Sequence, residues 1–131
     1  MLLKIKAGLK KNNNKLPNGT RIIFIVYILI VALISLVPLS GLNISLSKIM
    51  VLGLIRLDIL LHVAIFVPFV PLWKTYRPSH SFWFVAISGL MIGAFAEGVH
   101  CILPYRSFDL YDLLGNIAGV VTGALVLLVT D

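Results

Sequence analysis

Residues 110–129 read LYDLLGNIAGVVTGALVLLV, a run in which Asp112 is the only charged residue. A helix of about 20 apolar residues crosses the roughly 30 Å hydrocarbon core of a bilayer. The run also carries Gly115, Gly119 and Gly123 at four-residue intervals, the small-xxx-small pattern that lets membrane helices approach closely. These residues therefore predict a transmembrane helix that packs tightly against a neighbour.

Three further apolar runs of similar length precede this one. They are 22–39, 57–73 (with 49–55 as an apolar prelude) and 82–103. Sixty per cent of the 131 residues are hydrophobic and twelve per cent are charged, which excludes an ordinary soluble domain. The sequence predicts an all-α protein, a compact bundle of four transmembrane helices, because lipid requires each span to satisfy its own backbone hydrogen bonds.

The basic residues predict how the bundle lies in the membrane. Eight of the eleven fall before the first span or between the second and third spans: Lys4, Lys6, Lys10, Lys11, Lys15, Arg21, Lys74 and Arg77. The other three, Lys48, Arg56 and Arg106, fall in the opposite loops. The positive-inside rule then places both termini in the cytoplasm, with a basic segment at 1–21 and a membrane domain at 22–130. This charge pattern gives no support for nucleic-acid binding, since attraction to anionic lipid accounts for it.

Polar residues interrupt the spans at helical intervals. Asp58 and His62 are four residues apart and share one face of the second span. In the third span, Glu97 and His100 follow a ridge made by Gly89 and Gly93. In the fourth span, the polar residues on the glycine stripe are Asp112 and Asn116. Ionisable groups at bilayer depth are costly, so each of these is a candidate functional residue.

The order of the spans predicts that these residues converge. The connection between the third and fourth spans is short, so the two should be antiparallel neighbours whose glycine stripes meet. One candidate ligand-binding cluster is then expected at the outward end of the bundle, formed by Asp58, His62, Glu97, His100, Arg106, Asp109, Asp112 and Asn116.

The same residues carry a resemblance to a known family. Asp58-x-x-x-His62, Glu97, and the block Pro104-x-Arg106-x-Phe108-Asp109-x-x-Asp112-x-x-x-Asn116-x-x-Gly119-x-x-x-Gly123 together resemble the VanZ-like membrane proteins. This chain departs from the common pattern in having His100 where Gln is usual. The resemblance implies a multi-pass protein of the bacterial cytoplasmic (inner or plasma) membrane. It also implies an accessory role in cell-envelope biology or in resistance to teicoplanin-type glycopeptides.

Three functions remain open at this stage. The first is binding of a membrane lipid headgroup or lipid-linked envelope precursor, in which Arg106 would contact a phosphate or carboxylate. The second is an intramembrane hydrolase or transferase, with Glu97, His100 and Asp112 as catalytic candidates and a divalent metal as a possible cofactor, to which His62 would also be a ligand. The third is a non-catalytic assembly partner, in which Arg106 pairs with the nearby carboxylates. A homo-oligomer or another membrane protein is an expected partner in any of these.

Overall fold

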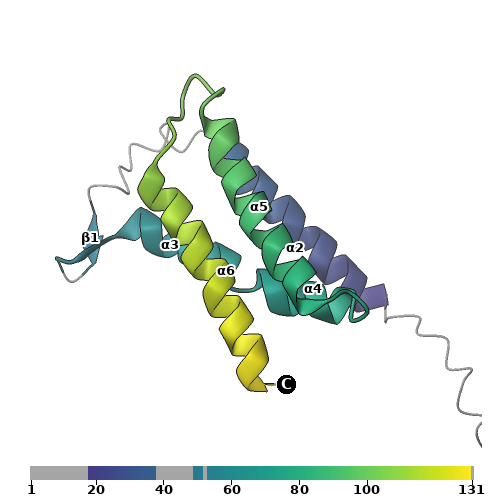
Figure 1. The fold of residues 1–131 in the computed structure, drawn as a ribbon. Coiled ribbons are helices and arrows are strands. Elements are labelled where there is room, and N and C mark those ends of the chain that lie inside the picture. The colour runs from purple at the N-terminus through teal and green to yellow at the C-terminus, as the bar shows by residue number, and fades with distance from the viewer. Residues whose placement is uncertain (1–17, 38–48, 52, 131) are drawn as a thin grey trace, which may run out of the picture.

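The computed structural model describes residues 18–37, 49–51 and 53–130. The helices are α2 (Asn18–Leu36), α3 (Leu57–Phe66), α4 (Phe69–Tyr76), α5 (Phe82–His100) and α6 (Leu110–Thr130), and a two-stranded hairpin, β1 (Met50–Val51) with β2 (Ile55–Arg56), precedes α3 (Figure 1). In the described residues four helices, with α3 and α4 counted as one, are long and apolar enough to cross a membrane. This confirms the predicted four-span helical bundle, while the cytoplasmic placement of the termini stays a prediction. Most of the predicted basic segment at 1–21 lies outside the described residues, since α2 begins at Asn18.

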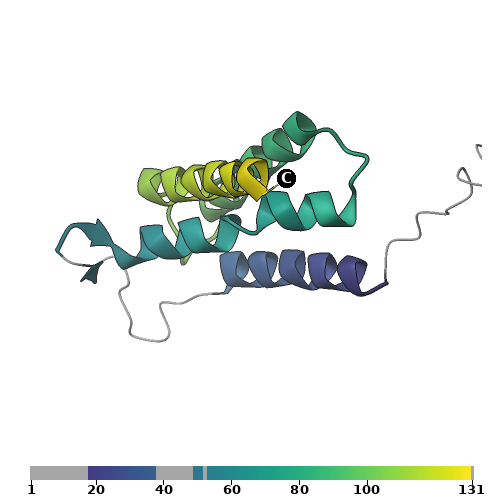
Figure 2. The same cartoon turned by 90° about the horizontal axis from the view of Figure 1, so that it is seen from below.

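The second span is broken by a proline. Pro68 separates α3 from α4 and has no N–H to continue the helical ladder. Pro71 lies in the first turn of α4, where a helix tolerates the missing donor. Helix α4 follows α3 along the span, α3 packs mainly on α6, and α4 lies against α6, α5 and α2 (Figures 1 and 2).

The glycines of α6 bring its backbone against α3. A Cβ built on Gly119 would lie 2.5 Å from the carbonyl oxygen of Val63, and one on Gly123 would overlap the carbonyl of Val67. Gly115 also has no room for a side chain, because a Cβ built on it would lie 2.9 Å from Cβ of His62. Only glycine therefore permits this approach, as the small-xxx-small pattern predicts.

The partner predicted for the α6 glycines is wrong. They face α3, whereas the α5 glycines face side chains: Gly93 faces Asn116 of α6, and Gly89 faces Phe69 of α4 and Val120 of α6. The second span lies against α6 along the glycine stripe, because α6 packs most extensively on α3. The hydrophobic core lies among α2, α3, α4, α5 and α6 and consists of Val31, Phe66, Phe69, Val70, Val85 and Val120.

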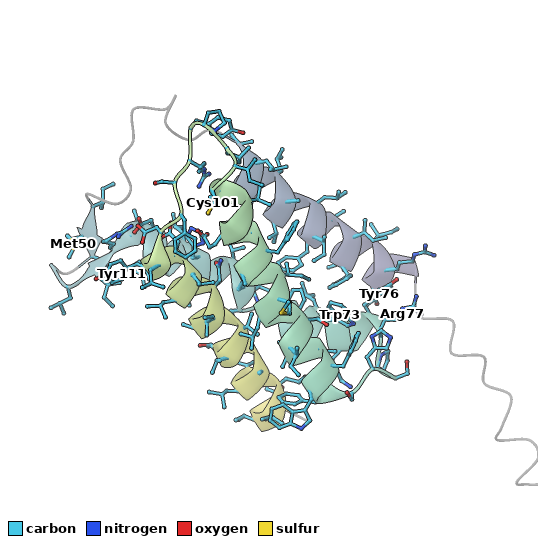
Figure 3. The ribbon with its side chains drawn as sticks, turned by 45° about the horizontal axis from the view of Figure 1, so that its top comes forward. Met50, Trp73, Tyr76, Arg77, Cys101 and Tyr111 are labelled. Atoms are coloured by element: carbon cyan, nitrogen blue, oxygen red, sulfur yellow. The ribbon has the colours of Figure 1, made fainter. Side chains whose placement is uncertain are left out.

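Helix α2 is attached mainly through aromatic residues near its first turns. The ring of Phe24 stacks on Tyr76, with 4.9 Å between centroids, and meets Trp73 edge-on. The hydroxyl of Tyr27 donates to the backbone carbonyl of Ile65 over 2.8 Å. Figure 3 shows Trp73 and Tyr76 together near the start of α2, at the end of the bundle opposite Tyr111.

The hairpin turns the chain into α3. Gly53 has a φ of 68°, a left-handed conformation that glycine adopts readily, and it allows the reversal between β1 and β2. Arg56 closes the hairpin opposite Met50 and is also the residue that precedes α3. This end of the bundle, which holds the hairpin and the first turns of α3 and α6, is called the hairpin end below.

Candidate functional site

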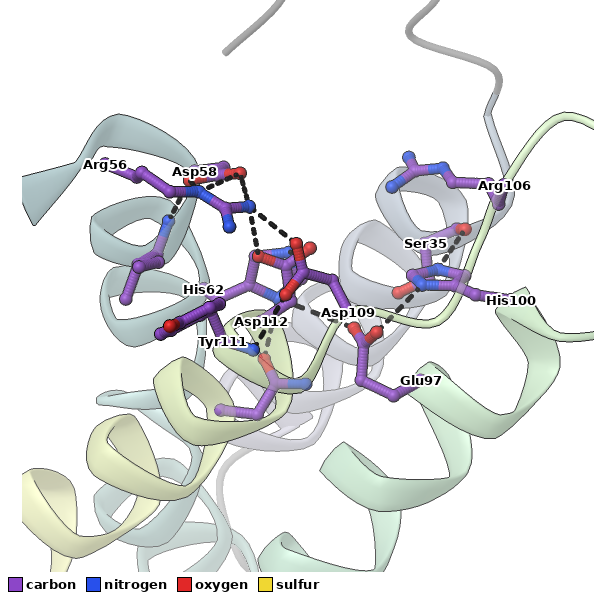
Figure 4. A network of polar contacts seen from close by, with 12 residues as sticks. Ser35, Arg56, Asp58, His62, Glu97, His100, Arg106, Asp109, Tyr111 and Asp112 are labelled. Atoms are coloured by element: carbon purple, nitrogen blue, oxygen red, sulfur yellow. Dashed lines mark hydrogen bonds and ion pairs between the residues drawn. The ribbon is translucent and has the colours of Figure 1, made fainter. Parts of the chain in front are cut away.

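Arg56 connects three carboxylates at the hairpin end (Figure 4). Its Nε donates to Asp58 over 3.1 Å, its Nη2 donates to Asp109 over 2.7 Å, and Nη2 also lies 3.8 Å from Asp112. The guanidinium stands over the ring of Tyr111, 5.4 Å from the centroid. A planar guanidinium with several donors is suited to joining carboxylates from separate segments, here the starts of α3 and α6.

The charges in this group stabilise one another. Hydrogen bonds from Arg56 to Asp58 and Asp109 raise the pKa of the guanidinium further above its ordinary value. Burial alone would raise the pKa of Asp109, but hydrogen bonds from Arg56 and from the backbone N–H of Tyr111 outweigh it and lower that pKa. Asp109 is therefore anionic, and Arg56 cationic, throughout the neutral range.

His62 is oriented by an amide. Asn116 is buried, and its Nδ2 donates to the backbone carbonyl of Gly93 over 3.2 Å. Because that carbonyl can only accept, the other amide atom, Oδ1, faces the ring of His62, 2.8 Å from Nδ1. Nδ1 is thus the donor nitrogen of His62. The opposite nitrogen, Nε2, lies 3.5 Å from Oδ2 of Asp112.

Glu97 and His100 form a buried pair on α5. Glu97 is fully buried and His100 is 3 % exposed. Oε2 of Glu97 lies 3.1 Å from Nδ1 of His100, and Nε2 of His100 donates to the backbone carbonyl of Ser35 at the end of α2 over 3.1 Å. Oε1 of Glu97 points the other way, 3.9 Å from Nδ1 of His62. The carboxylate therefore lies between the two histidines.

Two oxygens of the cluster are buried without a partner. Within the described part of the chain, neither Oε1 of Glu97 nor Oδ1 of Asp112 accepts a hydrogen bond. Buried polar atoms in folded proteins are nearly always bonded to protein or water. Oδ1 of Asp112 nevertheless lies 3.8 Å from Nη2 of Arg56, whereas Oε1 of Glu97 is paired with no Arg or Lys among the described residues, which makes Glu97 a candidate ligand contact.

Arg106 does not make the ion pairs that the assembly hypothesis expects of it. Its Nη2 donates to the backbone carbonyls of Ile34 and Val37, over 3.2 and 3.0 Å, and it makes no ion pair among the described residues. Pro38 has no N–H to offer to Ile34, so the end of α2 needs such donors. The predicted pairing of Arg106 with Glu97, Asp109 or Asp112 is therefore wrong.

With the site's geometry in place, comparison with known proteins places the chain in a family. The model of the VanZ/LLP1 family matches residues 11–130. This chain belongs to the VanZ/LLP1 family. No curated protein and no solved structure matches it.

In this VanZ/LLP1 member, most of the predicted site residues lie together. One connected cluster, called the acidic cluster below, contains Arg56, Asp58, His62, Glu97, His100, Asp109, Asp112 and Asn116. Arg106 lies apart from it, at the end of α2 (Figure 4). Arg56 was missed because it was counted only as a loop residue. The signal that could have identified it is its position two residues before Asp58, at the start of a span.

Two sets of side chains in the cluster have the ligand types and spacing for a metal ion. The first is His62, Glu97 and Asp112, and the second is Asp58, Asp109 and Asp112. In each set the ligand atoms lie within 4.8 Å of one another. The two sets share Asp112, and the second already surrounds the guanidinium of Arg56.

Proposed function

We propose that this VanZ/LLP1 protein binds the phosphate-bearing headgroup of a membrane lipid or lipid-linked envelope precursor at the acidic cluster. The proposal rests chiefly on the buried Oε1 of Glu97, which accepts no hydrogen bond among the described residues, at the hairpin end of a membrane bundle. The distribution of basic residues supports placing this end outside the cytoplasm.

The side chains of the cluster range from partly exposed to fully buried. The side chains of Arg56 and Asp109 are 23 % and 30 % exposed, His62 is 20 % exposed and Glu97 is 0 % exposed. A headgroup entering from the hairpin end would meet Arg56 and Asp109 first and Glu97 last. A few polar groups that converge from separate helices are typical of ligand sites.

The charge of the cluster restricts the ligand. The cluster contains four carboxylates, those of Asp58, Glu97, Asp109 and Asp112, and one guanidinium, which contacts the three aspartates. A bare anion would be repelled, because like charges at close range disfavour one another. The phosphate of the headgroup should therefore bind together with a cation that offsets the negative charge of the carboxylates.

Native mass spectrometry of the purified protein, resolving bound lipids, tests the proposal. The wild type should retain a phosphate-bearing lipid, and Glu97→Gln, which keeps the shape but removes the charge, should lose it. Tyr27→Phe is the matched control, because Tyr27 bonds Ile65 away from the cluster and its loss should leave lipid retention unchanged. Equal retention by wild type and Glu97→Gln would refute binding at this cluster.

An accessory role in envelope biology, including susceptibility to teicoplanin-type glycopeptides, follows from the same proposal. Binding of an envelope precursor would change its supply or exposure. Deletion of the gene should then alter teicoplanin susceptibility in its host, and complementation with Glu97→Gln should not restore it. If Glu97→Gln restored the original teicoplanin susceptibility, the resistance effect would not depend on the acidic cluster.

Hydrolysis of the bound headgroup is the second candidate, favoured by the position of Oε1 of Glu97 beside His62. A water at this oxygen would add to phosphorus as its proton passes to the Glu97 carboxylate. The bond between phosphorus and the departing oxygen would break, and that oxygen would take the proton back from Glu97, which restores the carboxylate. Incubation with phosphate- and diphosphate-linked lipids should then release product from wild type and none from Glu97→Gln. Retained but unchanged lipid would leave binding as the activity of the site.

A further inference from the structure

The unpartnered oxygen of Glu97 needs a partner of positive character. Glu97 is fully buried, and its second oxygen is committed to His100. Leaving a carboxylate oxygen desolvated without a bond costs several kcal/mol. Oδ1 of Asp112 also accepts no hydrogen bond among the described residues, but it lies 3.8 Å from Nη2 of Arg56, and it is Oδ2 that faces His62.

His62 completes this arrangement with a nitrogen that has a lone pair. Its Nδ1–H is occupied by Asn116, whose amide is fixed in turn by the carbonyl of Gly93. In the neutral ring Nε2 then carries no hydrogen, and it faces Asp112 over 3.5 Å. Two acceptors that face each other are brought together by a cation between them. A histidine metal ligand characteristically donates its other ring N–H to an oxygen, as His62 does.

The neighbouring carboxylates have a cation already. Arg56 lies among Asp58, Asp109 and Asp112, but its contacts among the described residues do not extend to Glu97. The cluster thus has two cation positions that share Asp112, and one of them is filled by a side chain. The position that lacks its charge is the one bounded by His62, Glu97 and Asp112.

We infer that His62, Glu97 and Asp112 bind a single divalent transition-metal ion, with at least one coordination position left for a ligand phosphate. Ligand atoms about 2.0–2.2 Å from one four-coordinate ion lie about 3.3–3.6 Å apart. One ligand atom from each of the three residues lies within 4.8 Å of the others, so rotations of flexible side chains would bring them onto the ion. The inference deepens the proposed function, on which it rests for the phosphate ligand, because the metal ion supplies the neutralising cation.

The ligand types define the class of metal. One imidazole with two carboxylates suits Zn²⁺ or Mn²⁺, whereas Ca²⁺ and Mg²⁺ prefer all-oxygen sites. Three protein ligands with an open position are typical of metal sites that bind or transform a substrate. Asn116 and His100 are the outer partners, which orient His62 and Glu97 respectively.

Metal binding to the purified full chain in detergent tests the inference. Zn²⁺ is added, excess is removed by dialysis, and bound zinc is measured by elemental analysis, while Co²⁺ reports the ligand geometry through its visible absorption. The wild type should bind about one ion per chain and give an intense cobalt spectrum of a four-coordinate site. Glu97→Gln and His62→Gln should each lose stoichiometric binding, and Asn116→Leu should weaken it by about 10–100-fold.

His80→Gln is the matched control. It removes an imidazole, as His62→Gln does, but one outside the acidic cluster, where its Nδ1 accepts from Nε1 of Trp73. Its zinc content should equal that of the wild type. Circular dichroism and size-exclusion profiles identify any variant that fails to fold, and the wild-type stoichiometry and cobalt spectrum do not depend on the variants.

The outcomes separate this inference from the proposed function. A wild type that binds no zinc and no cobalt, or a His80→Gln variant that loses both to the same extent as His62→Gln, overturns the metal site. Lipid retained by metal-free wild type would leave headgroup binding standing without it. Stoichiometric metal with no lipid retained would establish the metal site and refute headgroup binding.

Discussion

Helices α6 and α2 are both apolar and of span length, but they are attached to the bundle in different ways. In α6, 28 % of the spanning residues are buried and three glycines bring its backbone against α3. In α2, 6 % are buried, and the helix is held by aromatic rings near its start and by capped carbonyls at its end. The acidic cluster lies on α3, α5 and α6, so its geometry depends on backbone contact and only indirectly on α2.

This difference indicates where substitutions should have global or local effects. At the α3–α6 contact an added atom would meet a backbone carbonyl, which cannot move without displacing the helix. At the end of α2 the contacts are long side chains reaching to carbonyls, and losing one leaves the others in place. Damage to α6 should therefore unfold the bundle, whereas damage to the α2 cap should loosen one helix end.

The largest effect is expected for Gly119→Val. The new side chain would overlap Val63 and Phe66 of α3, so the variant should lose about 2–3 kcal/mol of folding free energy. Gly98→Val is the matched control, since a Cβ at Gly98 meets nothing within 4 Å. Thermal unfolding in detergent checks both, and equal stability of the two variants would contradict the packing seen at α6.

The next effect concerns the buried amide that joins α5, α6 and α3. Asn116→Leu removes bonds to His62 and Gly93 and leaves both partners unsatisfied, which should cost about 1–2 kcal/mol. Thr122→Leu, on the exposed face of α6, should have little effect. Denaturation in a detergent series measures the difference, and a loss at Thr122 as large as at Asn116 would remove the distinction.

A smaller and local effect is expected at α2. Arg106→Gln releases the carbonyls of Ile34 and Val37, while Tyr105 still donates to Leu36 over 2.9 Å. Overall stability should fall by about 1 kcal/mol or less. Faster hydrogen exchange confined to the last turns of α2 is the expected signature, and Arg77→Gln is the control on the opposite side of the bundle. Exchange that speeds up equally in α6 would show that the two helices are not held independently.

The smallest effect is that of acid. The pKa of Asp109 is lowered in the folded protein, so its bond to Arg56 contributes stability above the unfolded value of 3.8 and loses it as pH falls through the folded pKa. The contribution of Asp109 to the free energy of unfolding should therefore be constant from neutral pH to about pH 5 and should decrease below pH 3.8. Asp109→Asn should flatten this part of the pH profile. An unchanged profile would show that the pair does not contribute.

The sequence predicted the spans and most of the cluster, because both follow from local patterns. Hydropathy located the four spans, and four-residue spacing put Asp58 with His62 and Asp112 with Asn116. Pro68, which has no N–H to donate, separates α3 from α4 within the second span. The short connection before Asp109 made α5 and α6 neighbours, which brought Glu97 into the cluster.

The parts that sequence reasoning missed depend on which helix faces which. Helical period gives a face but not its partner, so the α6 glycines were matched to α5 when they face α3. The roles of the two outward arginines were also exchanged. Arg56 reaches the carboxylates because the hairpin folds back at Gly53, and Arg106 is drawn to α2 because that helix ends with unbonded carbonyls. Neither fact is encoded in spacing along one helix.

The hydrogen bond from His100 to Ser35 has a consequence for proton movement. A carbonyl oxygen only accepts, so Nε2 keeps its hydrogen whether the imidazole is neutral or cationic. Any proton exchanged with Glu97 must therefore enter or leave on the other side of the ring, at Nδ1. The hydrogen bond to Ser35, at the C-terminal end of α2, is therefore the same before and after such an exchange. The position of this helix end should not change when Glu97 gains or loses a proton.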